Sequence, residues 1–253
     1  MKHLILPDAH DRPGTNQDRF EWIGNLAVQR RPDVIIDIGD FADMESLCSY
    51  DKGKKEYEGR RYIKDVASAR KARERLMAPI HTHNAKYPDD QYTPKLKALV
   101  GNHEARITKA TSLQPELDGF LNIDDLGAVE MGWDVVPFLQ PIMINGIAYC
   151  HYFTSGVMGR PIGGKSPAGM LLEKKHISCI QGHDHLLDFS CATRADGKKI
   201  MAMTVGCYFD YDMHWAGPAN SIYWRGVVML NDVKDGSFDP EAININRMKK
   251  EYS

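Results

Sequence analysis

Five short apolar segments of the chain each run directly into polar residues that can bind metal ions. The segments cover residues 4–6, 34–38, 96–100, 147–150 and 177–180. Their apolar, β-branched character is typical of buried strands. The residues that follow them are, in order, Asp8 and His10, then Gly39 and Asp40, then Gly101-Asn102-His103-Glu104, then His151, and finally Gly182-His183-Asp184-His185. Any fold that buries these five segments therefore places a polar group at the end of each.

Helical patterns separate several of these segments. We predict a helix introduced by a capping box at residues 15–18 and ended by Pro32, a long charged helix at roughly 56–86, and a short helix that starts at Ser166-Pro167 and runs through Lys175. Later strands are predicted at 199–205, 222–230 and 242–245, with a hairpin turn at Asp235-Gly236. Alternating strands and helices favour a mostly parallel sheet, and functional groups collect at the carboxyl ends of such strands. We therefore expect the five polar clusters to meet.

The composition is ordinary for a globular protein. The 253 residues are 43% hydrophobic and 26% charged, and the formal charge of −2 gives no global attraction to nucleic acid or to an acidic membrane. The first apolar run is too short for a signal peptide, and no stretch approaches the roughly 18 apolar residues of a membrane span. We expect one cytoplasmic domain over residues 1–253, with a charged helical insertion at about 44–95.

The five cysteines fit this location. They are odd in number, include no C-x-x-C pair and sit mostly among apolar residues, so we interpret them as buried thiols in a reducing compartment. They are Cys48, Cys150, Cys179, Cys191 and Cys207.

Each polar cluster taken alone has a simple structural explanation, such as a turn or a helix cap. Together they combine Asp, Asn and His, which suit borderline divalent metals, and every copy falls at the end of a strand. His183 and His185 are two residues apart, so in an extended chain they point the same way and could reach adjacent ions. Asp8 and His10 have the same spacing. The combination therefore favours a metal site.

In this order, the motifs D-x-H, G-D-x-x-D, G-N-H-E, a His after a strand, and G-H-x-H resemble those of the calcineurin-like metallophosphoesterase family across residues 8–185. The resemblance implies a two-sheet β-sandwich flanked by helices, in a four-layer α/β/β/α arrangement. It also implies two metal ions: one held by Asp8, His10 and His185, the other by Asn102, His151 and His183, with Asp40 bridging both through its two oxygens. His103 would face the substrate as a catalytic residue. Asp43 would orient His103, although a helix N-cap is an equal alternative for it.

The chemistry implied by the resemblance is hydrolysis of a phosphoester. Two divalent ions lower the pKa of a shared water from about 15.7 towards about 7, and the resulting hydroxide attacks phosphorus while His103 assists the leaving group. Four imidazole ligands argue against Ca²⁺ and Mg²⁺. We take Mn²⁺ as the preferred ion, and Fe, Zn²⁺, Co²⁺ and Ni²⁺ remain open.

Two features narrow the substrate. Met44-Glu45 follow Asp43 where protein Ser/Thr phosphatases have Arg-Gly, which disfavours a protein phosphatase. Residues 52–75 contain ten Lys or Arg against four Asp or Glu, which hints at nucleic acid, although a solvated helix face with charge pairs is the commoner explanation. We therefore lean to a phosphodiesterase, with nucleotides or nucleic acid among its candidate substrates. A phosphomonoesterase, a nuclease and a catalytically inactive metal-binding scaffold of the same fold are the alternatives.

Four cations near these motifs are candidate substrate-binding residues. Arg12 and Arg106 could meet a phosphate or pair with nearby carboxylates. Arg160 and Lys165 belong to residues 159–166, which match the P-loop pattern G-x-x-x-x-G-K-S. That match lacks its usual strand-to-helix context, so a P-loop NTPase is disfavoured, but the stretch could still border the active site. Tyr152 and Phe153 could stack on a substrate, and we prefer simple packing beside a strand for them.

Overall fold

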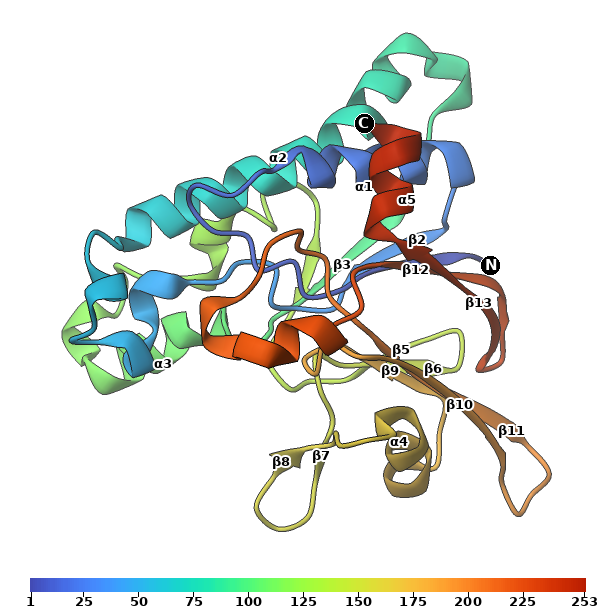
Figure 1. The fold of residues 1–253 in the computed structure, drawn as a ribbon. Helices are drawn as coiled ribbons and strands as arrows, with labels where there is room; N and C mark the ends of the chain where they lie inside the picture. The colour runs from blue at the N-terminus through green and yellow to red at the C-terminus, as the bar shows by residue number, and fades with distance from the viewer.

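Two mixed β-sheets organise the chain, which the computed structural model describes from residue 1 to residue 253 (Figure 1). The first sheet has the order β13-β12-β1-β2-β3-β4. Its parallel strands are β1 (His3–Leu6), β2 (Val34–Asp37), β3 (Lys95–Leu99) and β4 (Asp134–Val136). Strand β12 (Gly226–Lys234) runs antiparallel to β1, and β13 (Ser237–Asn244) runs antiparallel to β12. The predicted parallel arrangement thus holds for the N-terminal strands, and the C-terminal hairpin extends it.

The second sheet has the order β10-β11-β9-β6-β5. Its strands are β5 (Ile142–Ile144), β6 (Ile147–Tyr149), β9 (Cys179–Gln181), β10 (Leu187–Thr193) and β11 (Lys199–Val205). Strands β6, β9 and β11 are parallel, and the two edge strands are antiparallel to their neighbours. A separate short hairpin consists of β7 (Thr154–Ser155) and β8 (Arg160–Pro161). Both sheets therefore direct parallel strands towards the polar clusters.

Five α-helices connect or follow the strands. They are α1 (Asp18–Arg30), α2 (Tyr62–Lys86), α3 (Ala105–Leu113), α4 (Pro167–Lys175) and α5 (Ile245–Tyr252). The remaining helical segments are 3₁₀ turns: η1 (Glu45–Leu47), η2 (Ser49–Asp51), η3 (Lys55–Tyr57), η4 (Pro88–Asp90), η5 (Pro115–Leu117), η6 (Ile123–Leu126) and η7 (His214–Ile222). No helix combines the length and the apolar character that crossing a bilayer requires.

Two predicted helix starts differ from the structure. Helix α2 begins at Tyr62 rather than near residue 56, because Gly59 adopts a positive φ of 79° that a continuing α-helix excludes. The predicted capping box at 15–18 is absent. Asn16 Oδ1 accepts a hydrogen bond from the backbone N–H of Asp18 instead, and the helix starts there. The hairpin turn at Asp235-Gly236 is confirmed, and both residues have positive φ, as a tight two-residue turn requires.

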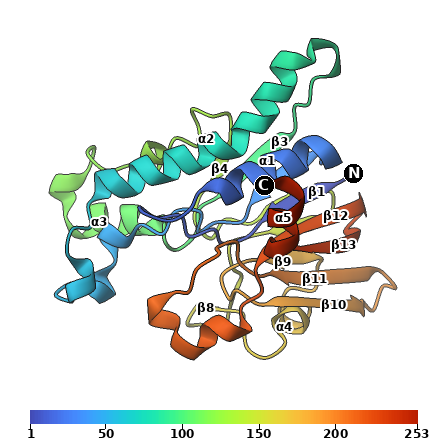
Figure 2. The same ribbon diagram turned by 45° about the horizontal axis from the view of Figure 1, so that its top comes forward.

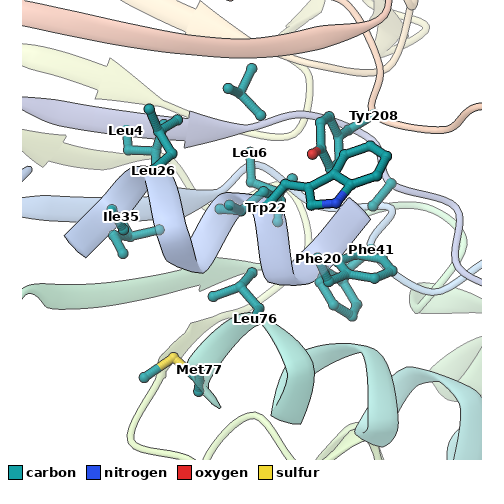
Figure 3. Close-up of a cluster of buried hydrophobic side chains, with 14 of the residues drawn as sticks. Leu4, Leu6, Phe20, Trp22, Leu26, Ile35, Phe41, Leu76, Met77 and Tyr208 are labelled. Carbon is teal, nitrogen blue, oxygen red and sulfur yellow. The ribbon is translucent and has the colours of Figure 1, made fainter. Parts of the chain in front are cut away.

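Alternation of side chains assigns each residue of the central strands to one of two cores. Leu4 and Leu6 of β1 lie in a cluster with side chains of α1 and α2, among them Phe20 and Leu76 (Figure 3). Ile5, between them, packs instead into a cluster with Ile180 and Val205 of the second sheet. Burying each such side chain contributes about 1.5–3 kcal/mol. The two sheets therefore face each other, with α1 and α2 on the outer face of the first.

Helix α4 covers the outer face of the second sheet. Leu171 and Leu172 of this helix cluster with Cys179 of β9 and Ala202 of β11. Figure 2 shows α4 below the second sheet and α1, α2 and α5 on the opposite side of the molecule. The layers thus run helices, sheet, sheet, helix, which leaves the carboxyl ends of the parallel strands as the place where both sheets contribute to one surface.

One cysteine departs from the expected burial. Cys191 is exposed, whereas Cys48, Cys150, Cys179 and Cys207 are buried and free. Cys191 lies on β10, the edge strand of the second sheet, whose burial pattern is mostly exposed or intermediate. The expectation of buried thiols is therefore wrong for this one residue.

Native protein treated with iodoacetamide should be alkylated at Cys191 and not at Cys150 or Cys179. The thiolate is the reactive form, and burial raises the pKa of Cys150 to about 11 and that of Cys179 to about 12. Peptide mass spectrometry measures the modified sites. In Cys191→Ser, Cys150 and Cys179 should take up label only when urea unfolds the chain, and labelling of native Cys179 at a rate comparable to Cys191 would contradict the burial described here.

Candidate metal centre

The predicted metal ligands converge at the carboxyl ends of five strands. They are Asp8 and His10 after β1, Asp40 after β2, Asn102 after β3, His151 after β6, and His183 and His185 after β9. Candidate ligand atoms lie within 4.8 Å of one another in each of three groups: Asp8, His10 and His185; Asp40, His151 and His183; and His10, Asp40 and His103. All these residues are buried except His183, which is intermediate. The structure thus brings together residues that are up to 177 positions apart in the chain.

The first ligand group consists of Asp8, His10 and His185. His185 Nε2 lies 3.3 Å from Asp8 Oδ2 and 3.1 Å from His10 Nε2. Ligands bonded at about 2.0–2.2 Å to one ion lie roughly 3 Å or slightly more from their neighbours. These separations fit donors that share a cation.

The second ligand group consists of Asn102, His151 and His183. His151 Nδ1 lies 3.1 Å from the carbonyl oxygen of Ile38, a geometry in which Nδ1–H donates and Nε2 is left as the candidate ligand atom. That Nε2 lies 2.9 Å from Asn102 Oδ1. Burial would lower the pKa of His151, but the carboxylates of Asp40 and Asp8 outweigh it and raise that pKa to about 10, so a proton on Nε2 fills this contact when no ion is bound. A metal ion shared by the two atoms would displace that proton, so the pair fits a bound cation.

Asp40 connects the two groups. Its Oδ2 lies 3.3 Å from His151 Nε2 and 3.9 Å from His10 Nε2. Its Oδ1 accepts a hydrogen bond of 2.9 Å from the backbone N–H of His103. We expected both oxygens to bridge. Here Oδ2 alone faces both groups, because the backbone of His103 occupies Oδ1.

Glu104, to which no role was assigned from the sequence, fixes the loops that carry these candidate ligands. Its Oε2 accepts hydrogen bonds from the backbone N–H groups of Asp40 at 3.1 Å and Gly101 at 2.9 Å. Its Oε1 accepts from Ala42 at 2.8 Å. Burial and the negative charge of Asp40 raise the pKa of Glu104 to about 7. The G-N-H-E motif contained the signal, since its last residue is the acceptor that joins the β2 loop to the β3 loop.

Two glycines of the motifs are required by close approach. A Cβ on Gly101 would lie 2.1 Å from Asp40 Oδ1, and one on Gly182 would lie 2.2 Å from Asp8 Oδ1. The backbone is also strained here, since His10, Asp40, His183 and His185 have φ between 44° and 73°. Such conformations cost about 1–3 kcal/mol each and persist where the surroundings enforce them, often at functional sites. Glycine is therefore required at these two motif positions because the backbone passes directly against a carboxylate.

A buried ion pair ties helix α2 to the Asp40 loop. Arg73 Nη2 donates to Asp37 Oδ2 at 2.9 Å, and the backbone N–H of Gly39 donates to Asp37 Oδ1 at 3.1 Å. The Arg73 guanidinium also lies over the ring of Phe41, 4.0 Å from its centroid. Arg73 thus contacts the chain on both sides of Asp40, which makes it a positioning residue for that carboxylate.

His103 and Asp43 form a contact pair beside the ligand groups. His103 Nδ1 lies 2.7 Å from Asp43 Oδ1, and His103 Nε2 lies 3.8 Å from Asp40 Oδ2. Burial alone would lower the pKa of His103, but the carboxylates of Asp40 and Asp43 outweigh it and raise that pKa. Asp43 caps no helix, since η1 has Met44 at its N-cap and no side-chain cap. Of the two interpretations of Asp43, the geometry favours the contact with His103.

Arg12 and Arg106 line the cavity above the ligands, which has a volume of about 860 Å³. Arg12 Nη1 donates to Glu45 Oε1 at 2.9 Å, and its guanidinium lies 4.4 Å from the ring centroid of Tyr211. Arg106 Nη1 donates to the carbonyl oxygen of Asp43 at 2.8 Å, and its Nη2 lies 3.2 Å from His103 Nε2. Arg106 is therefore held beside His103, and Arg12 lies 3.9 Å from Oδ2 of Asp43, the residue that contacts His103.

Arg160 and Lys165 are not among the residues that line this cavity. Arg160 lies in the exposed β7–β8 hairpin, and Lys165 is exposed just before α4. The backbone N–H of Ala168 at the start of α4 donates to Asp188 Oδ2 at 3.0 Å, so a carboxylate occupies the position where a P-loop would hold phosphate. The structure does not bring these two residues to the metal centre.

Aromatic side chains surround the ligand imidazoles, and most were missed from the sequence. The ring centroid of Tyr223 lies 4.6 Å from that of His185, and Phe209 lies 5.6 Å from His10. Tyr152 lies 4.5 Å from His183, whereas Phe153 packs in the α4 core as expected. Phe209 and Tyr223 lie in the long connection between β11 and β12. This connection has no regular residue spacing from which their positions could be predicted.

Neither a comparison with protein-family models nor a search of curated proteins found a match to this chain. The convergence of ligand atoms from five strand ends is thus the observation from which a function can be argued.

Arg73→Leu should weaken Mn²⁺ binding by about 10- to 100-fold, the usual effect of losing a group that orients a ligand. It should also lower the free energy of unfolding by about 3–5 kcal/mol, since Asp37 would remain buried without its partner. Calorimetric Mn²⁺ titration and urea unfolding measure the two effects.

Arg75→Leu is the matched control on the same helix. Arg75 pairs with Asp18 and Glu21 at the surface, so this variant should lose less than about 1 kcal/mol and bind Mn²⁺ normally. Unchanged Mn²⁺ affinity in a folded Arg73→Leu protein would rule out the positioning role.

Proposed function

We propose that this protein is a dinuclear metal-dependent phosphoester hydrolase of the calcineurin-like metallophosphoesterase type. The observation that carries the proposal is the pairing of two ligand groups around one carboxylate, Asp40. The order of the layers, helices outside two facing sheets, supports the same family, in which a four-layer sandwich is expected.

The donors limit the ions. All are nitrogen or oxygen atoms, and no cysteine belongs to the groups. Such a set suits Mn²⁺, which we propose as the preferred ion, and also accepts Fe, Zn²⁺, Co²⁺ or Ni²⁺. When bound, a pair of such ions supplies a nucleophile at neutral pH and neutralises charge on the phosphoryl oxygens.

The chain's own residues would perform three further tasks. Asp43 holds Nδ1 of His103, so that Nε2 points to the cavity and can give a proton to the leaving oxygen. Arg12 and Arg106 line the cavity. Their guanidinium groups would bind those phosphoryl oxygens that the metal ions do not contact. Glu104 and Arg73 keep the Asp40 loop in place.

A metal-binding scaffold without catalysis would need the same ligands but not the rest of the site. Arg106 beside His103 adds a cation that metal binding alone does not require, and this favours an enzyme. The preference for phosphodiesters rests on the two residues after Asp43. Protein phosphatases have Arg-Gly there, whereas this chain has Met44-Glu45, and Glu45 accepts a hydrogen bond from Arg12. The basic stretch supports it less, because Arg60, Arg70, Arg73 and Arg75 all pair with carboxylates.

Protein stripped with EDTA and reloaded with Mn²⁺ should hydrolyse bis-p-nitrophenyl phosphate, with lower turnover of p-nitrophenyl phosphate, and chelation should abolish both activities. About two ions should bind per chain. Asp40→Asn should lose metal and activity together, whereas Lys165→Ala should keep both. A P-loop NTPase would show the reverse, because its activity depends on the P-loop lysine. Elemental analysis and initial rates measure these outcomes. Two bound ions without turnover, for every metal tested, would favour the scaffold.

His103→Gln should lower kcat by about 10²–10⁴ for a methyl or other alkyl leaving group, the usual contribution of a general acid. The loss should be much smaller for p-nitrophenolate, which leaves without a proton. Comparing p-nitrophenyl and alkyl esters of the same phosphate tests this. An equal loss with both leaving groups would assign His103 a role in binding instead.

A further inference from the structure

Two large aromatic side chains stand exposed at the mouth of the metal-site cavity. Tyr50 of η2 is 83% exposed and Trp215 of η7 is 64% exposed, and both line the cavity. Figures 1 and 2 both show the segment of η1–η3, in blue, beside η7, in orange, at the edge where the parallel strands end. By contrast, Trp22 and Trp133 are buried. Two segments far apart in the sequence thus bring flat apolar surfaces to one opening.

Three cations that line the cavity are already paired. Arg60 Nη1 lies 2.8 Å from Asp51 Oδ2, and Lys54 Nζ lies 3.0 Å from Asp51 Oδ1. Arg12 is paired with Glu45. A polymer such as DNA or RNA is held mainly by rows of cations free to contact successive phosphates. The mouth offers no such row.

The size of the cavity fits a small ligand. Its volume of about 860 Å³ falls within the range of about 300–1,000 Å³ found for pockets that enclose small molecules. The cavity that the two exposed rings line is also lined by Arg12, Arg106 and members of both ligand groups: His10, His185, Asn102 and His183. One molecule with a phosphate at one end and a flat ring at the other could therefore contact both.

We propose that Tyr50 and Trp215 are specificity-determining residues that stack on a planar aromatic ring of a small phosphoester, such as the base of a nucleotide. The inference rests on the proposed function for the placement of the phosphate. Stacking accepts any flat ring, because every base presents a π-face, so the rings select for the presence of a base rather than for one base.

The test compares two ligands that differ only by the base. These are the methylene phosphonate analogues of adenosine 5′-monophosphate and ribose 5-phosphate, whose P–C bond is not hydrolysed. Calorimetric titration of the Mn²⁺-loaded protein should give about 10-fold tighter binding of the adenosine compound, as expected for one or two stacking contacts. Tyr50→Ala and Trp215→Ala should each reduce this preference, and the double variant should abolish it.

Two controls separate stacking from general damage. Trp215→Phe keeps a flat ring and should keep most of the preference. Phe120→Ala removes an aromatic side chain that is 79% exposed but does not line the cavity, and should change nothing. Equal affinity for the two analogues, or a preference that survives in the double variant, would overturn the proposal.

Two further measurements distinguish this inference from the proposed function. Release of inorganic phosphate from phosphoesters is followed separately: turnover without a base preference defeats the stacking role alone, and a base preference without turnover leaves it standing while the hydrolase proposal fails. Binding of a short oligothymidylate is measured at rising salt. Tighter binding of this polymer than of the adenosine analogue, steeply salt-dependent and unaffected by the double variant, would point to nucleic acid and against a small substrate.

Discussion

The crowding of buried carboxylates and imidazoles at the strand ends is the constraint on which the site depends. Asp8, Asp40 and Asp43 are all buried, and each has an imidazole nitrogen within 3.3 Å of one of its oxygens. Backbone N–H groups hold the Asp8 and Asp40 carboxylates in place. Cations bound between these groups would displace protons from the imidazoles and neutralise the carboxylates, so metal binding should be coupled to the stability of this edge of the molecule.

Three separate contacts hold Asp40 and its loop in place. Together they allow Asp40 to keep an unfavourable backbone conformation. Glu104 accepts from its backbone N–H, the backbone of His103 donates to its Oδ1, and the Asp37–Arg73 pair anchors the turn before it. Its φ of 53° is unfavourable for a residue with a side chain. A left-handed conformation at this residue allows the carboxylate to point back between the sheets. The strain is therefore the consequence of aiming one oxygen at both ligand groups.

The strands and ligands were predictable because their signals are local. Apolar runs followed by D-x-H or G-D-x-x-D can be identified within ten residues, and the structure places these residues where the pattern predicted. The partners that hold them were not predictable, since Arg73 meets Asp37 and Phe41 only after α2 folds across the sheet. Residues 159–166 match a phosphate loop that their context already disfavoured, and Asp188 from a neighbouring strand caps the helix that follows; the expectation that Arg160 and Lys165 border the site is wrong. Neither the pairing of the basic stretch nor the exposure of Cys191 is visible without tertiary structure.

The site divides into a rigid floor and a variable mouth, and the two arise from different parts of the fold. The floor is built on strand ends and is enclosed by aromatic rings, so its geometry changes little without unfolding the sheets. The mouth is built from 3₁₀ turns: Asp51, next to Tyr50, pairs with Lys54 and Arg60, and Asn220 of η7 hydrogen-bonds to the backbone of Met213 and Gly217. Chemistry needs fixed distances, whereas recognition tolerates adjustment around a ring. Placing Tyr50 and Trp215 on turns outside the sheets therefore allows the selectivity of the protein to change without disturbing the groups that would bind metal.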